Sequence, residues 1–201
     1  MEQLYPLFLS FIMVFIAELG DKTQLLVLSF SGSVRPRNIL LGIAIGSFFS
    51  HGIAIIFGSH VGVLENQALL NAIKFFTYLS FILIGVISLL PKKEKLSSDS
   101  EGKASILEKI SNLKLNYTLI IALTILVGEF GDKTFLASLG FGIEYPDYKK
   151  MLVIGAILGM VISDSLGIIF GKFLNKYISE EKMKKFSGVL FLIFGLVGLI
   201  F

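Results

Sequence analysis

Residues 18–23 read Glu-Leu-Gly-Asp-Lys-Thr, and residues 129–134 read Glu-Phe-Gly-Asp-Lys-Thr, 111 positions later (129 minus 18). Each block lies inside a long apolar segment, so two carboxylates and a lysine stand where the flanking residues indicate hydrocarbon. A charged side chain at the centre of a bilayer costs at least about 2.5–3.5 kcal/mol, and such residues are rare and usually functional. The repeated block is therefore the feature around which the chain is organised.

Composition places the chain among integral membrane proteins. It has 201 residues, of which 54% are hydrophobic and 16% charged, whereas a soluble domain carries about 25% charged residues. The net charge of +3 lies mainly in loops and, with a pI near 9.0, indicates membrane orientation and not nucleic-acid binding. The absence of cysteine excludes disulfides and thiolate-bound metals. We therefore expect membrane lipids around the chain and no nucleic-acid partner.

The apolar blocks are long enough for six membrane spans, since a spanning helix needs about 20 mostly apolar residues. We predict spans at 4–30, 39–59, 70–90, 117–140, 151–172 and 185–201. The loops after the first, third and fifth spans carry 13 of the 18 Lys and Arg residues, whereas the opposite side carries three. The positive-inside rule then predicts that both termini lie outside and that residues 91–116 lie in the cytoplasm. We expect a multi-pass protein of the cell's inner (plasma) membrane.

The two halves of the chain match beyond the repeated block. Residues 41–46 and 154–159 align at an offset of 113, and the third spans of the two halves align at an offset of 110. This indicates a duplicated three-helix unit, with one copy in residues 1–90 and the other in residues 117–201. Three is odd, so the second copy enters the membrane from the opposite side, as in many secondary transporters. We expect an all-α membrane protein with six transmembrane helices arranged as two inverted three-helix repeats.

Residues 91–116 connect the two predicted repeats. The segment is polar and rich in serine at first, and residues 105–108 then form a capping-box pattern followed by apolar residues on one helical face. We expect a cytoplasmic linker that contains a short amphipathic helix on the membrane surface.

Each repeated block places a glutamate and an aspartate three residues apart, and residues at i and i+3 share one face of a helix. The glycine between them allows either the helix to loosen or another backbone to approach closely, and discontinuous helices are common at the ion sites of transporters. If the repeats face each other, four carboxylates converge: Glu18, Asp21, Glu129 and Asp132. Four like charges in a dry site need a counter-charge, which a divalent cation supplies and which protons supply when the cation leaves. The blocks predict the metal site of a cation/proton antiporter, with no other cofactor and no enzyme activity.

Other polar residues of the blocks are candidates for supporting roles. Thr23 and Thr134 add hydroxyl oxygens, and Gln24 adds an amide. Lys22 and Lys133 each follow the glutamate of their own block by four residues, which is good geometry for a helical ion pair. Each lysine either forms a structural ion pair there or replaces the cation while the site is empty.

His51 and Asp164 occupy equivalent positions in the second and fifth predicted spans, at the offset of 113. We expect Asp164 to act in proton handling or cation access, and His51 either to act likewise or to form an interhelical hydrogen bond. Oxygen ligands suit Ca²⁺, Mn²⁺ and Mg²⁺, and a nitrogen from His51 shifts the preference slightly towards Mn²⁺.

Small residues recur four positions apart in the second and fifth spans, as Gly42 with Gly46 and Gly155 with Gly159. Such pairs predict helices that pack closely. Glu144 lies near the predicted outer surface, where we expect it to be solvated.

The doubled Glu-x-Gly-Asp-Lys-Thr resembles the signature of the Gdt family of cation transporters, which is related to the lysine-exporter superfamily. Both copies fit the signature without departure, and the resemblance covers all six predicted spans. It implies export of Mn²⁺ or Ca²⁺ from the cytosol in exchange for protons, with Mn²⁺ favoured for a bacterial-type member. It also implies that the acidic residues of the signature bind the cation, which are here Glu18, Asp21, Glu129 and Asp132.

Two other functions compete with export of a divalent metal. An exporter of amino acids or other small cations, as in the wider superfamily, fits four hard oxygen ligands less well. An intramembrane aspartyl protease also uses two aspartates within spans, but its Gly-x-Gly-Asp pattern is absent from both blocks. The duplication makes a monomer sufficient for one complete site and leaves a homo-oligomer open.

Overall fold

The computed structural model describes residues 4–19, 21, 24, 30, 34–64, 66–90, 115–177 and 180–200, and this part of the chain forms helices and turns but no strand. The predicted amphipathic helix after residue 105 lies outside the described residues. The α-helices are α1 (Leu4–Glu18), α3 (Pro36–Ser47), α4 (Ile53–Gly62), α5 (Gln67–Leu89), α7 (Tyr117–Glu129), α8 (Lys133–Glu144), α9 (Lys149–Tyr177) and α10 (Glu180–Ile200), with a π-helix η1 (Phe48–Gly52) and a 3₁₀-helix η2 (Pro146–Tyr148).

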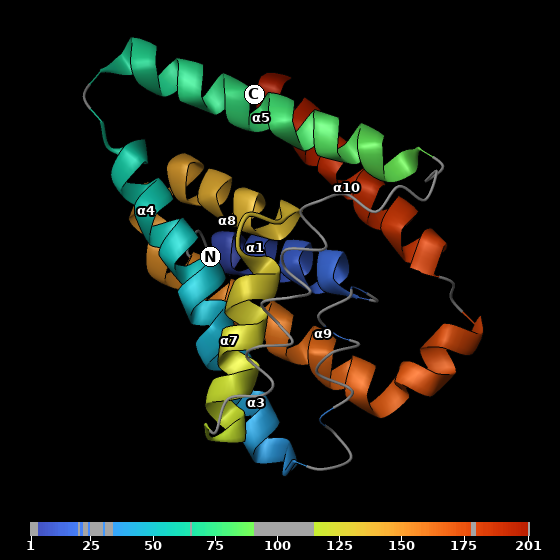
Figure 1. Ribbon diagram of the computed structural model, residues 1–201. Coiled ribbons are helices and arrows are strands. Elements are labelled where there is room, and N and C mark those ends of the chain that lie inside the picture. Colours follow the sequence, from blue (N-terminus) through green and yellow to red (C-terminus); the bar gives the residue numbers. More distant parts are fainter. Residues whose placement is uncertain are drawn as a thin grey trace.

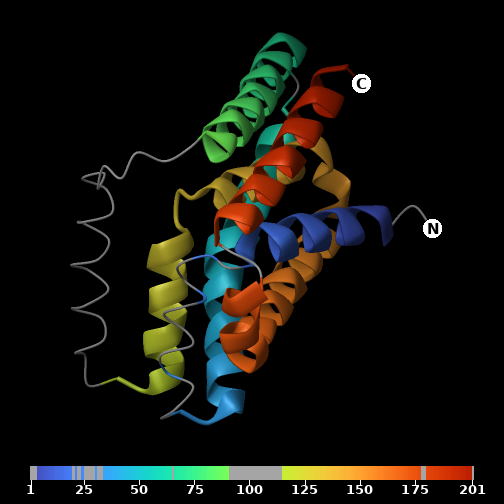
Figure 2. The same ribbon diagram turned by 90° about the vertical axis from the view of Figure 1, so that its right-hand side faces the viewer.

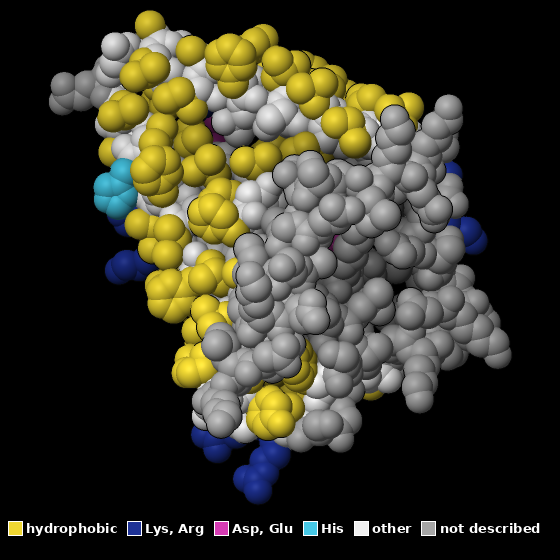
Figure 3. Space-filling view, in the orientation of Figure 1, with side chains coloured by type: hydrophobic (Ala, Val, Ile, Leu, Met, Phe, Trp, Pro, Cys, Tyr) yellow, Lys and Arg dark blue, Asp and Glu magenta, His cyan; other side chains and the backbone are white. Residues whose placement is uncertain are grey.

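Three helical segments of the described chain are long and apolar enough to cross a membrane: Pro36–Gly62, Gln67–Leu89 and Pro146–Ile169. Three shorter apolar helices accompany them, at Leu4–Glu18, Tyr117–Glu129 and Lys185–Ile200. Hydrophobic side chains cover the described part of the face drawn in Figure 3, and cationic side chains gather at its edges. This surface fits an all-helical protein embedded in a bilayer.

The predicted span over 117–140 is not one continuous helix. α7 ends at Glu129, and α8 begins at Lys133. Between them Phe130 is extended, with ψ of 119°, and Gly131 has φ of 75°. That φ lies in the left-handed region, where glycine is favoured because it has no Cβ to clash with the backbone. The loosening expected at this glycine is confirmed, and it interrupts the helix completely.

The second predicted span, 39–59, is continuous from α3 through η1 to α4, but its centre is a turn of π-helix. Turns of this kind are rare and often occur at functional sites, because the wider turn changes the direction in which side chains project. His51 lies in η1 and is fully buried.

Helices from the two halves of the chain pack against each other in pairs. α5 lies against α10, α1 against α9, α3 against α7 and α4 against α8. Figures 1 and 2 both show α5 and α10 side by side at one end of the molecule. The ring of Phe81 on α5 meets Phe141 of α8 and Phe191 of α10 edge to face, with centroids 6.4 and 5.9 Å away. This aromatic cluster joins the α5–α10 pair to the rest of the fold.

Glycines allow α3 to approach α7 closely. A Cβ at Gly42 would lie 2.8 Å from the carbonyl oxygen of Thr118, and one at Gly46 would lie 2.7 Å from that of Ala122. Real Cβ atoms essentially never come within 3.0 Å of such an atom. The close packing predicted from these two glycines is therefore confirmed.

The interface between α9 and α1 is built in the same way. A Cβ at Gly155 would collide with the carbonyl oxygen of Leu7, and one at Gly159 would lie 2.7 Å from that of Phe11. The two glycine pairs thus serve two separate interfaces, each between one long helix and the helix that ends at a repeated block.

Replacing Gly46 with alanine should destabilise the fold by about 1–3 kcal/mol, because overpacking forces the two helix backbones apart. The matched control is Gly52→Ala, whose Cβ would come nearest to the Phe48 side chain, at 3.1 Å, where a small side-chain rotation relieves the contact. Thermal unfolding of the purified protein in detergent measures both variants. An equal unfolding midpoint in the two would contradict the proposed role of Gly46.

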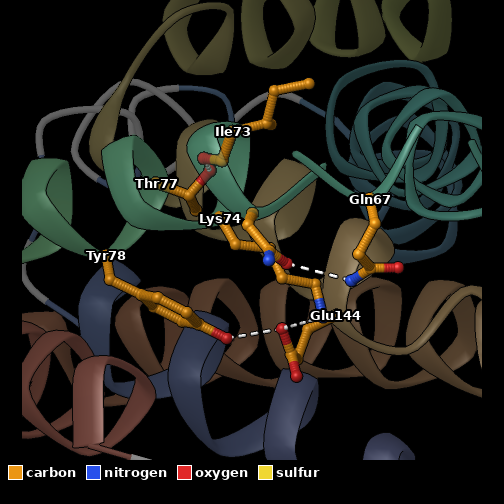
Figure 4. A network of polar contacts seen from close by, with 7 residues as sticks. Gln67, Ile73, Lys74, Thr77, Tyr78 and Glu144 are labelled. Atoms are coloured by element: carbon orange, nitrogen blue, oxygen red, sulfur yellow. Dashed lines mark hydrogen bonds and ion pairs between the residues drawn. The ribbon is translucent and has the colours of Figure 1, made fainter. Parts of the chain in front are cut away.

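Glu144 is not simply solvated, so that prediction is wrong. Its Oε2 accepts a hydrogen bond of 2.5 Å from the Tyr78 hydroxyl and lies 3.0 Å from the Lys74 Nζ (Figure 4). Tyr78 and Lys74 both belong to α5, whereas Glu144 ends α8. The sequence does not show that α5 passes the end of α8, so these partners were not foreseeable. We refer to these three residues as the Glu144 network.

Candidate metal centre

Three of the four predicted carboxylates meet inside the fold. Glu18, Asp21 and Glu129 each offer one oxygen, and the three oxygens lie within 4.8 Å of one another. Ca²⁺ binds oxygens at about 2.3–2.6 Å, so ligands on opposite sides of one ion lie about 4.6–5.2 Å apart, and this spacing fits a single divalent cation. We call these three residues the carboxylate cluster.

The carboxylate cluster is buried. Glu18 and Glu129 are 0% exposed, and Asp21 is partly exposed. Both carboxylate oxygens of Glu18 lack a hydrogen-bond partner among the described residues. A buried carboxylate without compensation costs several kcal/mol, so the position needs a positive charge or a proton.

Two helix ends assemble the cluster. Glu18 is the last residue of α1 and Glu129 is the last residue of α7. In each block the chain then turns, and the aspartate N–H donates to the glutamate carbonyl, at 3.1 Å for Asp21 and 3.0 Å for Asp132. The expected helical geometry of the blocks is therefore wrong, because each helix ends at its glutamate. The carboxylates of Glu18 and Asp21 nevertheless lie together, as expected for the first block.

The ends of α1 and α7 also contribute to the electrostatics of the site. The C-terminal end of a helix carries a partial negative charge from its unsatisfied carbonyls. Glutamates at two such ends add to this negative potential instead of neutralising it. The arrangement is unfavourable for helix stability and favourable for binding a cation.

Asp132 does not belong to the group of oxygens within 4.8 Å. It is partly buried at the N-cap position of α8, where a negative charge is favourable, and its charge acts on Glu18. The structure therefore brings three of the predicted carboxylates together and leaves Asp132 at the edge of the site.

Lys133 forms an ion pair across the two blocks. Its Nζ lies 3.9 Å from Oδ1 of Asp21, and its side chain is 19% exposed. The ion pair is thus made with the other block, and the break between α7 and α8 removes the helical i to i+4 geometry between Lys133 and Glu129. Lys22 and Thr23, the corresponding candidates of the first block, lie outside the described residues.

Two other supporting candidates have different roles in the structure. The Thr134 hydroxyl donates to Oε2 of Glu129 at 3.2 Å and so orients a cluster carboxylate. The amide nitrogen of Gln24 donates to the carbonyl oxygen of Ser163 at 2.7 Å, and its side chain lies against Gly167. Gln24 therefore joins the first block to α9.

His51 and Asp164 are both fully buried, as expected for mid-span polar residues, but neither belongs to the carboxylate cluster. Both oxygens of Asp164 and Nε2 of His51 lack a hydrogen-bond partner within the described part of the chain. Asp164 directly follows Ser163, whose carbonyl oxygen accepts the hydrogen bond from Gln24, so it lies next to the contact between α9 and the segment after the first block.

Ser138 is a residue that sequence reasoning missed. Its hydroxyl lies 3.3 Å from Nδ1 of His51, so α8 holds the ring of a residue on η1. Ser138 stands four residues after Thr134, and both are buried. That helical spacing from the block was the only signal in the sequence that could have drawn attention to it.

Apolar helices, an interrupted helix and buried carboxylates at two helix ends are typical of integral membrane proteins that carry cations. The chain belongs to the GDT1 family of divalent cation/proton antiporters, whose sequence profile matches residues 6–96 and 117–201. It is therefore a multi-pass membrane transporter of divalent cations and not an enzyme.

Several relatives cover most of the chain. A protein of Vibrio cholerae serotype O1, named provisionally as a manganese exporter, is 28% identical over 194 residues, which are 96% of this chain and 90% of that protein. A GDT1-like protein of Synechocystis is 23% identical and covers 93% of both chains. A chloroplastic GDT1-like protein of rice is 27% identical over 92% of this chain, which spans only 58% of the rice protein. No solved structure matches the fold.

Proposed function

We propose that the protein exports Mn²⁺ from the cytosol across the cell's inner membrane in exchange for protons, with Ca²⁺ as a second substrate. One observation carries the proposal: acidic oxygens from both repeated blocks lie within 4.8 Å of one another, and the Glu18 carboxylate among them is buried. All-oxygen sites suit both ions. The name of the Vibrio cholerae relative supports manganese.

In this proposal the carboxylate cluster binds the ion, and Asp132 becomes a ligand as the site changes shape. Thr134 orients Glu129 through its hydrogen bond. Protonation of the carboxylates on the outer side releases the cation there, since a neutral acid is a poor ligand for a hard cation. His51 and Asp164 line the route by which cations or protons reach the cluster.

Two inverted repeats of three spans each, at 1–90 and 117–201, provide the frame for this exchange. The contacts support this arrangement because they repeat with the offsets of the sequence. Gly42 faces Thr118, whereas Gly155 faces Leu7. The sequence positions of the two glycines differ by 113 (155 minus 42), and those of their partners differ by 111 (118 minus 7). These are the offsets that relate the second spans and the repeated blocks in the sequence. Rocking of one repeat against the other then gives alternating access.

The distribution of basic residues supports a topology with both termini outside and the 91–116 linker in the cytoplasm. Acidic residues of both blocks meet in the cluster, which supports the proposal that a monomer is sufficient for a complete site. Homo-oligomers are compatible with this arrangement but are not needed for transport.

Flux in proteoliposomes tests the function directly. We expect Mn²⁺ to enter the vesicles with protons moving in the opposite direction, as reported by a pH dye inside. Ca²⁺ should compete with Mn²⁺, because both ions take oxygen ligands, whereas lysine should not compete. Flux of Mn²⁺ without proton movement would refute the antiport, and inhibition by lysine would favour an amino-acid exporter.

A further inference from the structure

We propose that Lys133 determines the preference of the site for divalent cations, because its ammonium is a permanent positive charge that the site contains in addition to the transported ion. This inference rests on the proposed function and adds a residue that sets the charge of the site. The inference concerns how the site distinguishes divalent ions from monovalent and trivalent ions. The identity of the oxygen ligands alone does not explain that preference.

The position of Lys133 calls for an explanation, because it is the first residue of α8. The N-terminal end of a helix carries a partial positive charge, so a cation is disfavoured there. The structure nevertheless keeps this side chain mostly inside the protein, 19% exposed, with its Nζ 3.9 Å from Asp21. The carboxylates, and not the helix, stabilise the ammonium at this place.

The ion pair also crosses between the repeated blocks. Lys133 follows the second block's Asp132 directly in the sequence, but its partner Asp21 belongs to the first block. The charges of Glu18, Asp132 and Glu129 act on Lys133 as well. The ammonium therefore acts on every member of the carboxylate cluster, and it is not a local ion pair of one helix.

Charge balance shows the consequence. In the described arrangement Asp132 lies outside the cluster. With the three cluster acids ionised, the cluster carries three negative charges, and Lys133 reduces the sum to two. A divalent cation then neutralises the cluster, whereas a monovalent ion leaves one negative charge and a trivalent ion leaves one positive charge. Without the ammonium, a trivalent ion would be needed to neutralise the three negative charges of the cluster.

The experiment compares equilibrium binding of Mn²⁺ and Tb³⁺ to the purified protein in detergent. Removing one positive charge in Lys133→Gln changes the binding energy of each ion in proportion to that ion's charge. If Mn²⁺ then binds about tenfold tighter, Tb³⁺ should bind about thirtyfold tighter, since tenfold raised to the power 3/2 is about thirty. Lys133→Arg, which keeps the charge, should bind both ions as the wild type does.

Several outcomes would overturn the assignment. Equal or weaker binding of both ions by Lys133→Gln would show that the lysine is a structural clamp. An equal gain for the two ions would show that its charge does not set selectivity. Lys133→Met repeats the test if the glutamine variant is not monodisperse. Failure of the wild type to bind Mn²⁺ would instead refute the proposed function, so the two failures are distinguishable.

The Glu144 network carries a second inference, which also rests on the proposed function: we infer that it holds the transporter closed on one side and so favours one resting orientation. Glu144 ends α8 of the second repeat, whereas Lys74 and Tyr78 lie on α5 of the first. The contacts of 3.0 and 2.5 Å therefore join the two repeats at the proposed outer side (Figure 4). In this inference, movement of one repeat against the other breaks these contacts.

The sequence allows this network on one side only. In an inverted repeat the mirror-image contacts would use the residues at the equivalent positions. Lys74 has the counterpart Lys184 (74 plus 110), but Glu144 corresponds to Ser33 (144 minus 111) and Tyr78 to Gly188 (78 plus 110). Serine has no carboxylate and glycine no side chain, so the mirror-image network cannot form.

The test measures the Mn²⁺ concentration for half-maximal flux from each side of oriented proteoliposomes. For Glu144→Gln we expect this concentration to fall about threefold to fivefold on the outer side, the size of effect expected from one partly exposed ion pair. Lys184→Met, at the position equivalent to Lys74, is the matched control and should change neither side. An equal change on both sides, or no change on either, would refute the inference.

Discussion

Replacing Glu18 with glutamine should lower Mn²⁺ flux at least about a hundredfold while the protein remains folded. Glutamine keeps the shape of the side chain and removes the negative charge. Loss of one charged partner from a buried site costs about 3 kcal/mol or more, and each 1.4 kcal/mol is tenfold in affinity. Uptake of Mn²⁺ by proteoliposomes, with monodispersity checked by size-exclusion chromatography, measures the effect.

Glu129→Gln should reproduce this loss, because Glu129 ends α7 as Glu18 ends α1 and both are fully buried. The matched control is Asp147→Asn in η2, which also removes one carboxylate but from an exposed position. We expect the control to transport as the wild type does. Normal flux in both glutamine variants would show that the carboxylate cluster is not the ion site.

Asp164→Asn should separate binding from transport. Asp164 lies outside the group of cluster oxygens, so we expect equilibrium binding of Mn²⁺ to change less than about threefold. Flux should fall at least about tenfold. A buried carboxylate without a partner among the described residues costs several kcal/mol, so we expect Asp164 to meet a cation or a proton during the cycle. Asparagine cannot take part in that step. Binding and uptake are measured on the same preparation.

The control for Asp164→Asn is Ser165→Ala on the same helix. The Ser165 hydroxyl donates to the Val161 carbonyl oxygen one turn earlier, so its loss should affect neither binding nor flux. If Asp164→Asn transported at the wild-type rate, Asp164 would be a structural residue that happens to be buried. If it lost binding as well, Asp164 would be part of the ion site itself.

The all-helical fold and the closely packed helix interfaces could be predicted from the sequence, because both depend on interactions of residues close together in the chain. Long apolar segments form helices because a bilayer leaves no other partner for backbone hydrogen bonds. Gly42 and Gly155 mark interfaces because only a residue without a side chain permits contact with a neighbouring backbone. These properties depend on residue type and spacing, and both can be read directly from the sequence.

Errors in the predicted site arose where an assumed helix was interrupted. The spacing of Glu129 and Asp132 suggested one helical face, but α7 ends at Glu129 and the left-handed Gly131 turns the chain. The same break removes the helical i to i+4 geometry between Lys133 and Glu129, and Lys133 forms an ion pair with Asp21 of the other block. A glycine inside an apolar segment indicates where a helix can break, and the surrounding packing determines whether it does.

By itself the sequence determined which residues carry charge inside the apolar segments, and their duplication indicated that they act together. Only the tertiary structure decided which of them meet: Glu18, Asp21 and Glu129 form the cluster, while Asp132 stays at its edge. The reason is that residue spacing fixes neighbours along one helix, whereas the cluster is formed by two helix ends 111 residues apart (129 minus 18). Their approach depends on how α1 and α7 pack against α9 and α3, and no local pattern specifies it.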